Sequence, residues 1–370
     1  SSTISDIQFR YQAHHKDFAI LYRTNAQSRS LEESLRKRNI PYKIYGGLSF
    51  YQRKEIKDLL AYYRLTINPN DEEAFKRIIN YPTRGIGSTT IQKLNIAANE
   101  MDISIWKIIN SLDKIDVNIN KGTKVKLQEF ALMINDYIVK SRKQDAYTIA
   151  EEIAKSTGLF NDLYADKTPE GVSRFENIQE LLNGIKDFSD TAEKGLDKLS
   201  DFMEDVALLT DQDKEDKNDF NKVTLMTVHA AKGLEFPYVF VVGLEENLFP
   251  SMMSGESQEN MEEERRLFYV AITRAKKRLF LSFATTRFRW GQFIDCRPSR
   301  FIAELDQSFL IKQEVIPKSV KKPHSIYAKT KSKPLSQPTK KFAPPKNLTN
   351  INRVKNIPIN ASDLSEIQTG

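Results

Sequence analysis

Two short runs of branched and aromatic apolar residues stand in the second half of the chain, and polar residues follow each. Val223–Val228 and Tyr238–Val242 have the length and composition of strands that are buried on both faces, which is typical of a parallel sheet. The polar segment His229–Glu235 directly follows the first run. Open parallel sheets bind their ligands at the carboxyl ends of the strands, so the pattern predicts a site in this segment.

The beginning of the chain repeats this alternation of strand and helix. Its pattern predicts a strand over Phe18–Tyr22, a helix over Ser28–Arg38 and a strand over Tyr42–Tyr45. An arginine-rich helix, predicted over Met261–Ala275, lies between the second apolar run of the other half and a third. Strands that alternate with helices indicate an α/β fold class.

The middle of the chain has a different texture. From about Gln52 to Asp213 the apolar residues follow a helical period, with breaks at Asn68–Asn70 and Pro82–Gly87. An all-helical stretch between two α/β stretches predicts an inserted domain. We therefore expect an α/β domain in two parts, residues 1–51 and 213–310, a helical domain over 52–212, and a tail over 311–370.

The charge of the chain is concentrated in the tail. The total is +7, but residues 315–362 hold eleven Lys or Arg and no acid, so the remainder sums to −4. With six Pro and nine Lys in residues 317–346, the tail predicts a disordered basic linker. Any nucleic-acid contact of the folded part must then come from local patches and stacking.

Composition excludes several classes of protein. One cysteine and four scattered histidines give neither a disulfide nor the spacing of a zinc site. No apolar run approaches the roughly 18 residues of a membrane span, and the amino terminus lacks the apolar core of a signal peptide. We expect a cytoplasmic protein without a membrane partner.

Four segments carry a resemblance to a known family. HAAKGLE at 229–235 and YVAITRA at 269–275 resemble motifs V and VI of superfamily 1A DNA helicases of the UvrD/Rep/PcrA family. DFAILYRTNAQSRSLEE at 17–33 resembles motif IV, and YGGLSFYQRKEIKD at 45–58 resembles the place where an accessory domain is inserted. Together these cover most of residues 17–305, and their spelling is closest to the PcrA branch. The resemblance implies a RecA-like domain, 2A, interrupted by a mainly α-helical domain, 2B.

The family's first RecA-like domain is not in this sequence. That domain supplies a GxxxxGK[ST] loop for the phosphates and an acidic motif for Mg²⁺. The chain has no Gly-Lys dipeptide, and its one Asp-Glu-Glu run, Asp71–Glu73, follows Asn-Pro-Asn as a turn leading into a helix. We expect the C-terminal motor half of an ATP-dependent 3′–5′ helicase of DNA repair and replication, inactive alone, with ATP and Mg²⁺ held mainly by a missing N-terminal domain.

The resemblance assigns residues to the nucleotide. It implies that Arg274 is an arginine finger, because a guanidinium brought from a neighbouring domain stabilises charge on the γ-phosphate. It assigns Glu235 to the ribose, while Lys232 suits a coupler between the ATP and DNA sites. Gly233 permits backbone conformations that a side chain blocks. The alternatives are that Arg274 only offsets a helix dipole and that Glu235 is simply solvated.

The arginines earlier on the same helix have a simpler interpretation. Arg265 and Arg266 follow three glutamates, so we expect them to form ion pairs along the helix. On a helix that continues to Ala275, Arg266 and Arg274 would lie about 80° apart.

Motif IV and motif V also supply candidates for DNA contact. Tyr22, Arg23, Thr24 and Asn25 combine an aromatic face, a cation and two hydrogen-bonding groups, which suit a sugar-phosphate backbone with a base stacked beside it. The alternative is a polar turn that opens the next helix, with Asn25 or Ser28 as its cap. His229 corresponds to a histidine that contacts single-stranded DNA in the family; alternatively it is a buried histidine with satisfied hydrogen bonds.

Two further segments point to DNA. Phe288 and Trp290 alternate with arginines after the last strand, a pattern typical of a platform for unpaired bases, although core packing is the alternative for both. Arg84, Gly85 and Gly87 precede a helix and resemble the helix-hairpin-helix element that grips duplex DNA in 2B; the backbone amides there suit a phosphate.

The expected partners follow from these assignments. They are single-stranded and duplex-junction DNA, the N-terminal half of the same helicase, and RNA polymerase through the C-terminal region. A non-enzymatic adaptor for DNA or RNA polymerase is the alternative from another class, but an adaptor has no use for an arginine finger. The helicase subunit of a recombination helicase-nuclease is a second alternative, but its clustered nuclease carboxylates are absent from the sequence.

Overall fold

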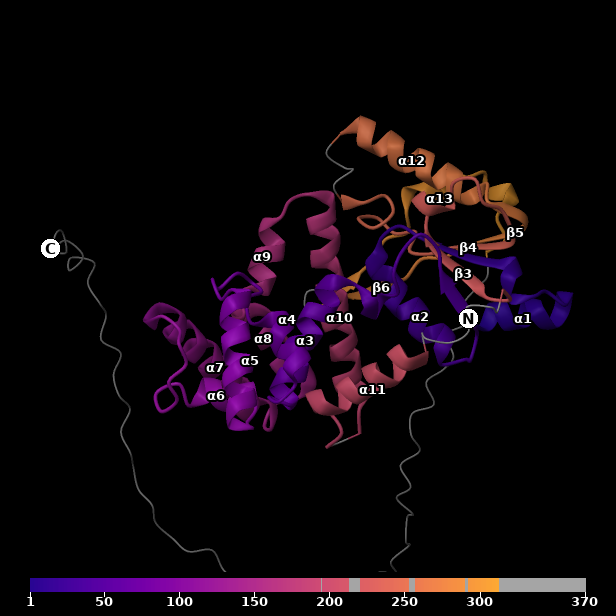
Figure 1. Ribbon diagram of the computed structural model, residues 1–370. Helices are drawn as coiled ribbons and strands as arrows, with labels where there is room; N and C mark the ends of the chain where they lie inside the picture. The colour runs from indigo at the N-terminus through magenta and orange to yellow at the C-terminus, as the bar shows by residue number, and fades with distance from the viewer. Residues whose placement is uncertain (194, 213–219, 253–256, 290–291, 313–370) are drawn as a thin grey trace, which may run out of the picture. The chain divides into compact units, whose positions relative to one another are not determined.

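The computed structural model describes residues 1–193, 195–212, 220–252, 257–289 and 292–312 (Figure 1). Internal contacts divide the chain into two units, Ser1–Ile311 and Lys312–Gly370. The second unit lies outside the described residues except for Lys312. Of the predicted basic tail, only Ile311 and Lys312 are described.

The first unit contains a five-stranded sheet in which all neighbouring strands are parallel. The strand order is β2-β3-β1-β4-β5. The strands are β1 Phe18–Tyr22, β2 Tyr42–Ile44, β3 Val223–Thr227, β4 Phe236–Val241 and β5 Ala275–Leu281. This confirms the predicted α/β class and the parallel sheet, and β1 has the predicted bounds.

Helices cover both faces of this sheet, which explains why β1 is apolar at every position (Figure 1). Ala19 and Leu21 belong to the core under α12 and α13, whereas the other three residues of β1 belong to the core under α1 and α2. The covering helices are α1 Ser2–Tyr11, α2 Ser28–Arg36, α12 Gln258–Ile272 and α13 Arg300–Glu304.

The segment between β2 and β3 is helical in the described residues and has a core of its own. Its centre is α3, whose Tyr62 and Tyr63 are completely buried. The helices are α3 Lys54–Ile67, α4 Glu72–Ile78, α5 Ser88–Met101, α6 Ile105–Asn110, α7 Lys121–Ser141, α8 Ala146–Ser156, α9 Leu159–Ala165, α10 Pro169–Thr191 and α11 Leu199–Gln212. Both predicted breaks lie between helices, and Asp71 caps α4 as the predicted turn requires. The domain boundaries proposed from sequence stay predictions.

The arginine-rich helix α12 has the predicted length but lies three residues earlier, because it begins at Gln258 rather than Met261. It ends at Ile272 rather than Ala275, because the Thr273 hydroxyl donates to the carbonyls of Tyr269 and Val270 and the Arg274 carbonyl accepts from Phe236 N–H. The backbone of Arg274 thus joins the sheet. The 80° relation expected between Arg266 and Arg274 does not hold.

A second difference lies after β5, where we expected a loop. Residues 286–289 and 292–295 form an antiparallel hairpin, β6 Thr286–Arg289 with β7 Gln292–Asp295, in which Phe288 pairs with Phe293. The short 3₁₀ helices are His15–Asp17, Asn25–Gln27 (η2), Phe50–Gln52, His229–Ala231 (η4) and Gln307–Phe309. Among the described residues no helix combines the length and the apolarity needed to cross a bilayer.

Candidate nucleotide and nucleic-acid site

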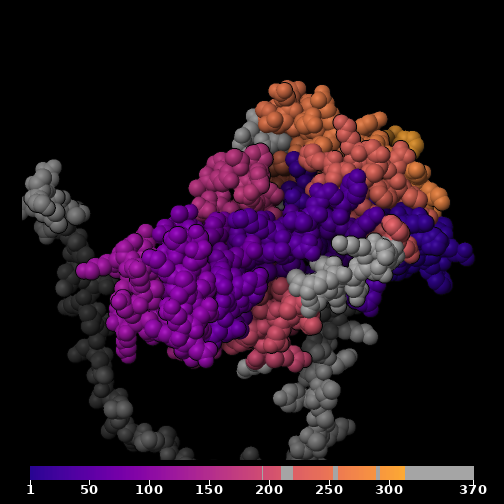
Figure 2. Space-filling model, in the orientation of Figure 1, coloured from indigo at the N-terminus to yellow at the C-terminus, as the bar shows by residue number. Residues whose placement is uncertain are grey.

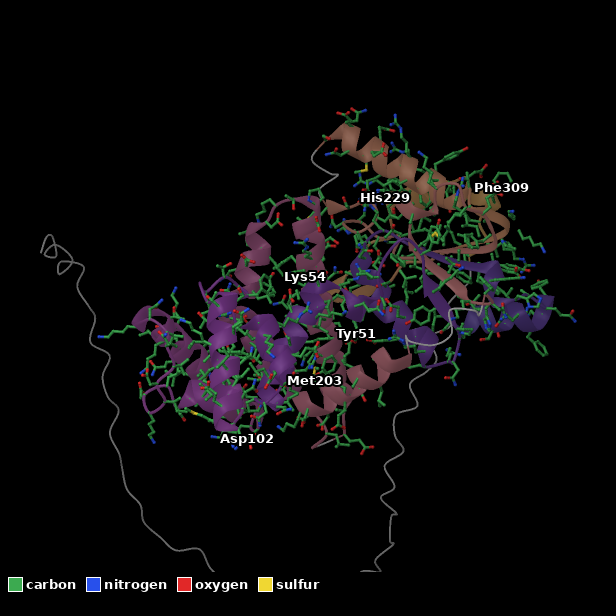
Figure 3. All side chains as sticks on the ribbon, in the orientation of Figure 1. Tyr51, Lys54, Asp102, Met203, His229 and Phe309 are labelled. Carbon is green, nitrogen blue, oxygen red and sulfur yellow. The ribbon has the colours of Figure 1, made fainter. Side chains whose placement is uncertain are left out.

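The segment after β3 runs from the carboxyl ends of the strands to their amino ends. We call these two sides of the sheet the carboxyl edge and the amino edge. Val228 N–H donates to the Tyr22 carbonyl at the carboxyl end of β1, whereas Phe236 pairs with Ala275 at the amino end of β5. Two parallel strands of one sheet, here β3 and β4 on either side of β1, require such a crossover. His229 therefore lies at the carboxyl edge, where Figure 3 labels it, and Glu235 at the amino edge. This corrects the expectation that the whole segment lies at the carboxyl end.

Arg274 lies at the amino edge and is held by neutral oxygens. Its guanidinium donates to the carbonyl of Leu234 at 3.1 Å, to the carbonyl of Val270 at 2.9 Å and to the hydroxyl of Thr273 at 3.0 Å. A guanidinium oriented by neutral groups keeps its full charge for an anionic partner. The bond to Leu234 also ties Arg274 to the loop that begins at His229.

The other nucleotide candidates lie around this loop. Glu235 and Lys232 are both exposed, and the Glu235 carboxylate lies 3.4 Å from Lys276. Gly233 has φ +84° and no neighbouring atom within 4 Å of an added Cβ, so its backbone conformation, not crowding, favours glycine there. The structure thus brings Glu235 and Arg274 to one edge, while Lys232 projects from the crossing loop.

Arg23 lies at the carboxyl edge in a two-point ion pair with α12. Its Nε donates to both oxygens of Glu264 at 3.0 and 3.1 Å, and its Nη2 lies 2.5 Å from Glu264 Oε1. The Arg23 side chain is 20% exposed and that of Glu264 only 6%. Glu264 Oε2 also accepts the Ser251 N–H at 3.3 Å.

The turn after β1 is organised by Gln27. Its Oε1 accepts the backbone N–H groups of Arg23 and Thr24, both at 2.9 Å, and it forms a capping box with Thr24. Neither Asn25 nor Ser28 is the cap that the sequence suggested, because Thr24 starts the turn one residue earlier. The Asn25 side chain instead accepts a hydrogen bond from Arg53 at 3.4 Å.

Tyr22 and His229 differ in their access to a base. Tyr22 is 1% exposed and fills the core under α1 and α2, so its ring has no face for a base in this structure. The His229 side chain is exposed. Partial burial of the imidazole and the positive charge of Arg23 lower the pKa of His229, whereas the negative charges of Glu264 and Glu263 act to raise it. A neutral imidazole suits stacking or a single hydrogen bond more than an ion pair.

The β6–β7 hairpin is attached to the sheet by a buried carboxylate. Glu245, which is 1% exposed, accepts Arg287 Nε at 2.5 Å and Nη2 at 2.8 Å, and the Ala284 N–H at 2.7 Å. Phe288 packs edge-on against Phe293 at 5.3 Å between ring centroids, and Phe293 is 78% exposed. Trp290 lies outside the described residues, so its predicted stacking role stays a prediction.

The turn before α5 is held from within. Arg84 donates to the carbonyls of Ile78 and Tyr81 and to the Tyr62 hydroxyl. In this structure its guanidinium stabilises the turn, because those acceptors surround it, and its phosphate contact stays a prediction.

The two glycines of this turn differ. Gly85 has φ +71°, and a Cβ there would lie 2.8 Å from the ammonium of Lys126 on α7; Gly87 is the N-cap of α5. Lys126, which sequence reasoning missed, therefore places its ammonium beside Gly85.

Sequence reasoning also missed the acidic partners of the site. Glu264 shares one face of α12 with Leu267, Phe268 and Ala271, and all four are buried. A glutamate at helical spacing within an apolar stripe was the available signal. In contrast, Arg265 and Arg266 pair with Glu262 and Glu263 as expected.

The fit to ATP is partial within this chain. Arg274, Lys232 and Glu235 supply two cations and a carboxylate, but no phosphate-cradling loop. Among the described residues no group of three or more His, Cys, Asp or Glu could hold a metal.

Comparison with known proteins gives consistent matches. The model of the UvrD-like helicase C-terminal domain matches residues 1–286. The chain is 41% identical to the ATP-dependent DNA helicase PcrA of Leuconostoc citreum over 314 residues, which are 83% of this chain and 42% of that protein. It is also 41% identical to the PcrA proteins of Staphylococcus epidermidis and Staphylococcus aureus. The first match covers 82% of this chain and 42% of the relative, and the second covers 80% of this chain and 40% of the relative. The chain thus spans less than half the length of these relatives.

Proposed function

Since this chain belongs to the family of UvrD-like helicase C-terminal domains, we propose that it is the C-terminal motor half of an ATP-dependent DNA helicase. In this proposal an N-terminal RecA-like domain completes the ATP site, and closure of the two halves drives 3′–5′ stepping along single-stranded DNA during repair and replication. RNA polymerase is a further proposed partner, through the C-terminal region.

One observation carries the proposal: two elements connect the opposite edges of the sheet. The loop from His229 to Glu235 is one, and Arg274 is bonded to it at Leu234. Helix α12 is the other, because Glu264 on α12 binds Arg23 at the carboxyl edge and the chain reaches Arg274 just after the helix ends. A movement of Arg274 toward a nucleotide would be transmitted to Arg23 and His229 through both.

At the amino edge the residues have distinct tasks. Bound ATP would supply the phosphoryl group whose transfer to water releases energy. Arg274 would place its positive charge on the γ-phosphate oxygens, and Glu235 would accept a hydrogen bond from the ribose. Lys232, on the crossing loop, would pair with a phosphate or a carboxylate as the halves close.

At the carboxyl edge the proposed track for single-stranded DNA runs past three groups. Arg23 would contact a phosphate, Thr24 and Asn25 would contact the backbone, and His229 would contact a base or phosphate. Phe288, and by sequence Trp290, would stack on bases. The turn at Gly85 and Gly87 would contact the backbone of the duplex ahead.

The test is Arg274→Ala in the protein that includes the N-terminal half. We expect the DNA-stimulated kcat for ATP hydrolysis to fall by roughly 10³-fold or more, because an arginine finger acts on transition-state charge. Nucleotide binding, measured by fluorescent-analogue titration, should change much less. Arg266→Ala is the matched control, since Arg266 is 79% exposed and its one ion pair among the described residues is with Glu263 at 3.3 Å.

Two outcomes would reject this function. Near-normal ATPase activity of Arg274→Ala would remove Arg274 from the finger role. A complete protein that binds DNA or RNA polymerase without any ATPase activity would favour the adaptor instead.

A further inference from the structure

The contact between Arg23 and Glu264 joins a candidate DNA-binding cation to a buried carboxylate. An ionised carboxylate that is 6% exposed is costly unless hydrogen bonds satisfy it. Glu264 has these bonds from Arg23 Nε, Arg23 Nη2 and Ser251 N. Glu264 lies in the apolar stripe with which α12 packs on the sheet, so its own position is fixed. The ion pair therefore immobilises Arg23.

The arrangement orients Arg23 for a second partner. A guanidinium has five N–H groups, and the two-point contact with Glu264 uses one edge of the fork. Among the described residues the other N–H groups have no recorded side-chain acceptor, and 20% of the side chain is exposed. The Gln27 side chain fixes the backbone of Arg23 as well. Both ends of Arg23 are thus fixed before any ligand arrives.

We propose that Glu264 is a positioning residue for the single-stranded DNA track: it holds one edge of the Arg23 guanidinium so that the other edge meets a backbone phosphate. The proposal rests on the proposed function of Arg23. Fixing the side chain in advance removes part of the entropy cost of ordering it on binding. Glu264 lies on α12, and the chain reaches Arg274 just after this helix. The ion pair therefore makes the orientation of the Arg23 side chain depend on the position of α12. Figure 2 shows part of α12, in orange, at the surface of the molecule.

Simple electrostatics predicts the opposite effect, which makes the test sharp. Replacing Glu264 by Gln removes a negative charge beside the track and by charge alone should tighten DNA binding. If Glu264 positions Arg23, the replacement should weaken binding, because the fork contact is lost. A carboxylate that merely sequesters Arg23 from DNA would also give tighter binding on removal.

The experiment measures binding of this 370-residue chain to a fluorescently labelled oligo-dT of about 16 nucleotides, at several salt concentrations. We expect Glu264→Gln to weaken binding about tenfold, as for one charge-assisted hydrogen bond, and to reduce the salt slope by roughly 0.7, one phosphate contact. Glu263→Gln is the matched control: it removes the same charge one residue earlier, from an exposed side chain paired with Arg266, and should not weaken binding.

A double-mutant cycle assigns the effect. Arg23→Ala should weaken binding, and adding Glu264→Gln to Arg23→Ala should cause no further loss if Glu264 acts only through Arg23. In the complete helicase, Glu264→Gln should raise the DNA concentration that half-maximally stimulates ATP hydrolysis. A fold defect alone would lower the maximal kcat, because less of the protein is active, and would leave that DNA concentration unchanged.

The outcomes separate this proposal from the function on which it rests. If Arg23→Ala binds DNA like the wild type, the assignment of Arg23 to the track is wrong. If Arg23→Ala weakens binding while Glu264→Gln leaves it unchanged or tightens it, the positioning role of Glu264 is wrong. Should Glu264→Gln not fold, Arg23→Lys gives the test: it keeps the charge but cannot be held by a fork, so wild-type affinity would overturn the proposal.

Discussion

At the scale of single residues, the half-buried arginines of the site are held in place by oxygen atoms of neighbouring residues. Arg23 is held by Glu264 and Gln27, and Arg274 by the carbonyls of Leu234 and Val270. Such support reduces the freedom that a side chain loses on binding a ligand. A small change in a supporting residue should therefore affect the site without touching a ligand.

Gly243 gives a test of this dependence. It follows β4 with φ +74°, and a Cβ there would lie 2.1 Å from Nε2 of Gln27. We expect Gly243→Ala to lower the free energy of unfolding by about 1–2 kcal/mol from the backbone conformation alone. It should also weaken oligo-dT binding, because Gln27 would have to leave the N–H groups of Arg23 and Thr24.

Chemical denaturation and the same oligo-dT titration check this prediction. Gly47→Ala is the control, since a Cβ at Gly47 would make an ordinary 3.7 Å contact with Ile44. If Gly243→Ala proved as stable as Gly47→Ala, the close packing of Gln27 against Gly243 would not matter.

The motif spelling grouped residues that the structure also brings close together, but it gave no sign of their distant partners. Arg274 and Glu235 were placed in the nucleotide group from motif spelling, and the structure brings both to one edge. Glu264 was missed because Arg23, its partner, is 241 positions away. Tyr22 was assigned to DNA because it adds an aromatic face beside Arg23, whereas here helices cover both faces of β1 and bury the ring.

At the scale of elements, a similar limit applies. The strand β1 was predictable to the residue because five consecutive apolar positions require two covered faces. The end of α12 was not, because the backbone of Arg274 is taken up by β4, and nothing local to the helix signals that bond. The β6–β7 hairpin was read as a loop because its strands have four residues each and few branched side chains.

The attachment of this hairpin should depend on pH. Burial by itself would raise the pKa of Glu245, but the hydrogen bonds from Arg287 and Ala284 outweigh it and the pKa lies below its ordinary value of 4.5. A carboxyl with a lowered folded-state pKa stabilises the protein fully above its unfolded pKa. The stabilisation is lost as the pH falls from about 4.5 through the lower folded-state pKa.

We expect Glu245→Gln to cost about 1–3 kcal/mol at pH 7, because Arg287 loses its charged partner, and to show a smaller loss of stability on acidification below pH 4.5 than the wild type. Thermal unfolding across this pH range measures both. Glu246→Gln is the control, since its partner Arg300 is 52% exposed and such pairs contribute about 0–1 kcal/mol. Equal losses of stability in the two variants would show that burial does not strengthen the contribution of Glu245 to the free energy of unfolding.

At the scale of the whole molecule, one arginine joins the α/β part to the helical part. Arg29 on α2 is 6% exposed, and its guanidinium lies 2.9 Å from Glu180 on α10 and 3.0 Å from Glu33 on its own helix. A Cβ at Gly184 on α10 would lie 2.5 Å from Arg29 Nη1, so the guanidinium packs directly on the α10 backbone. Burial alone would lower the pKa of Arg29, but Glu180 and Glu33 raise it.

This contact should contribute to stability and to the coupling between the two parts. Arg29→Ala is expected to lower the free energy of unfolding by about 1–3 kcal/mol, less than for a wholly buried pair because Glu33 and Glu180 retain 21% and 22% exposure to solvent. Hydrogen exchange should increase in α2 and in α10 around Gly184, since each helix loses the same packing partner.

Lys186→Ala on the same helix is the control. Lys186 forms an exposed pair with Asp190, one turn away, and its loss should change stability by about 0.5 kcal/mol or less. Faster exchange confined to α2 in Arg29→Ala would contradict the predicted link, because it would mean that α10 does not depend on Arg29. Faster exchange in both helices would show that Arg29 couples the α/β part to the helical part.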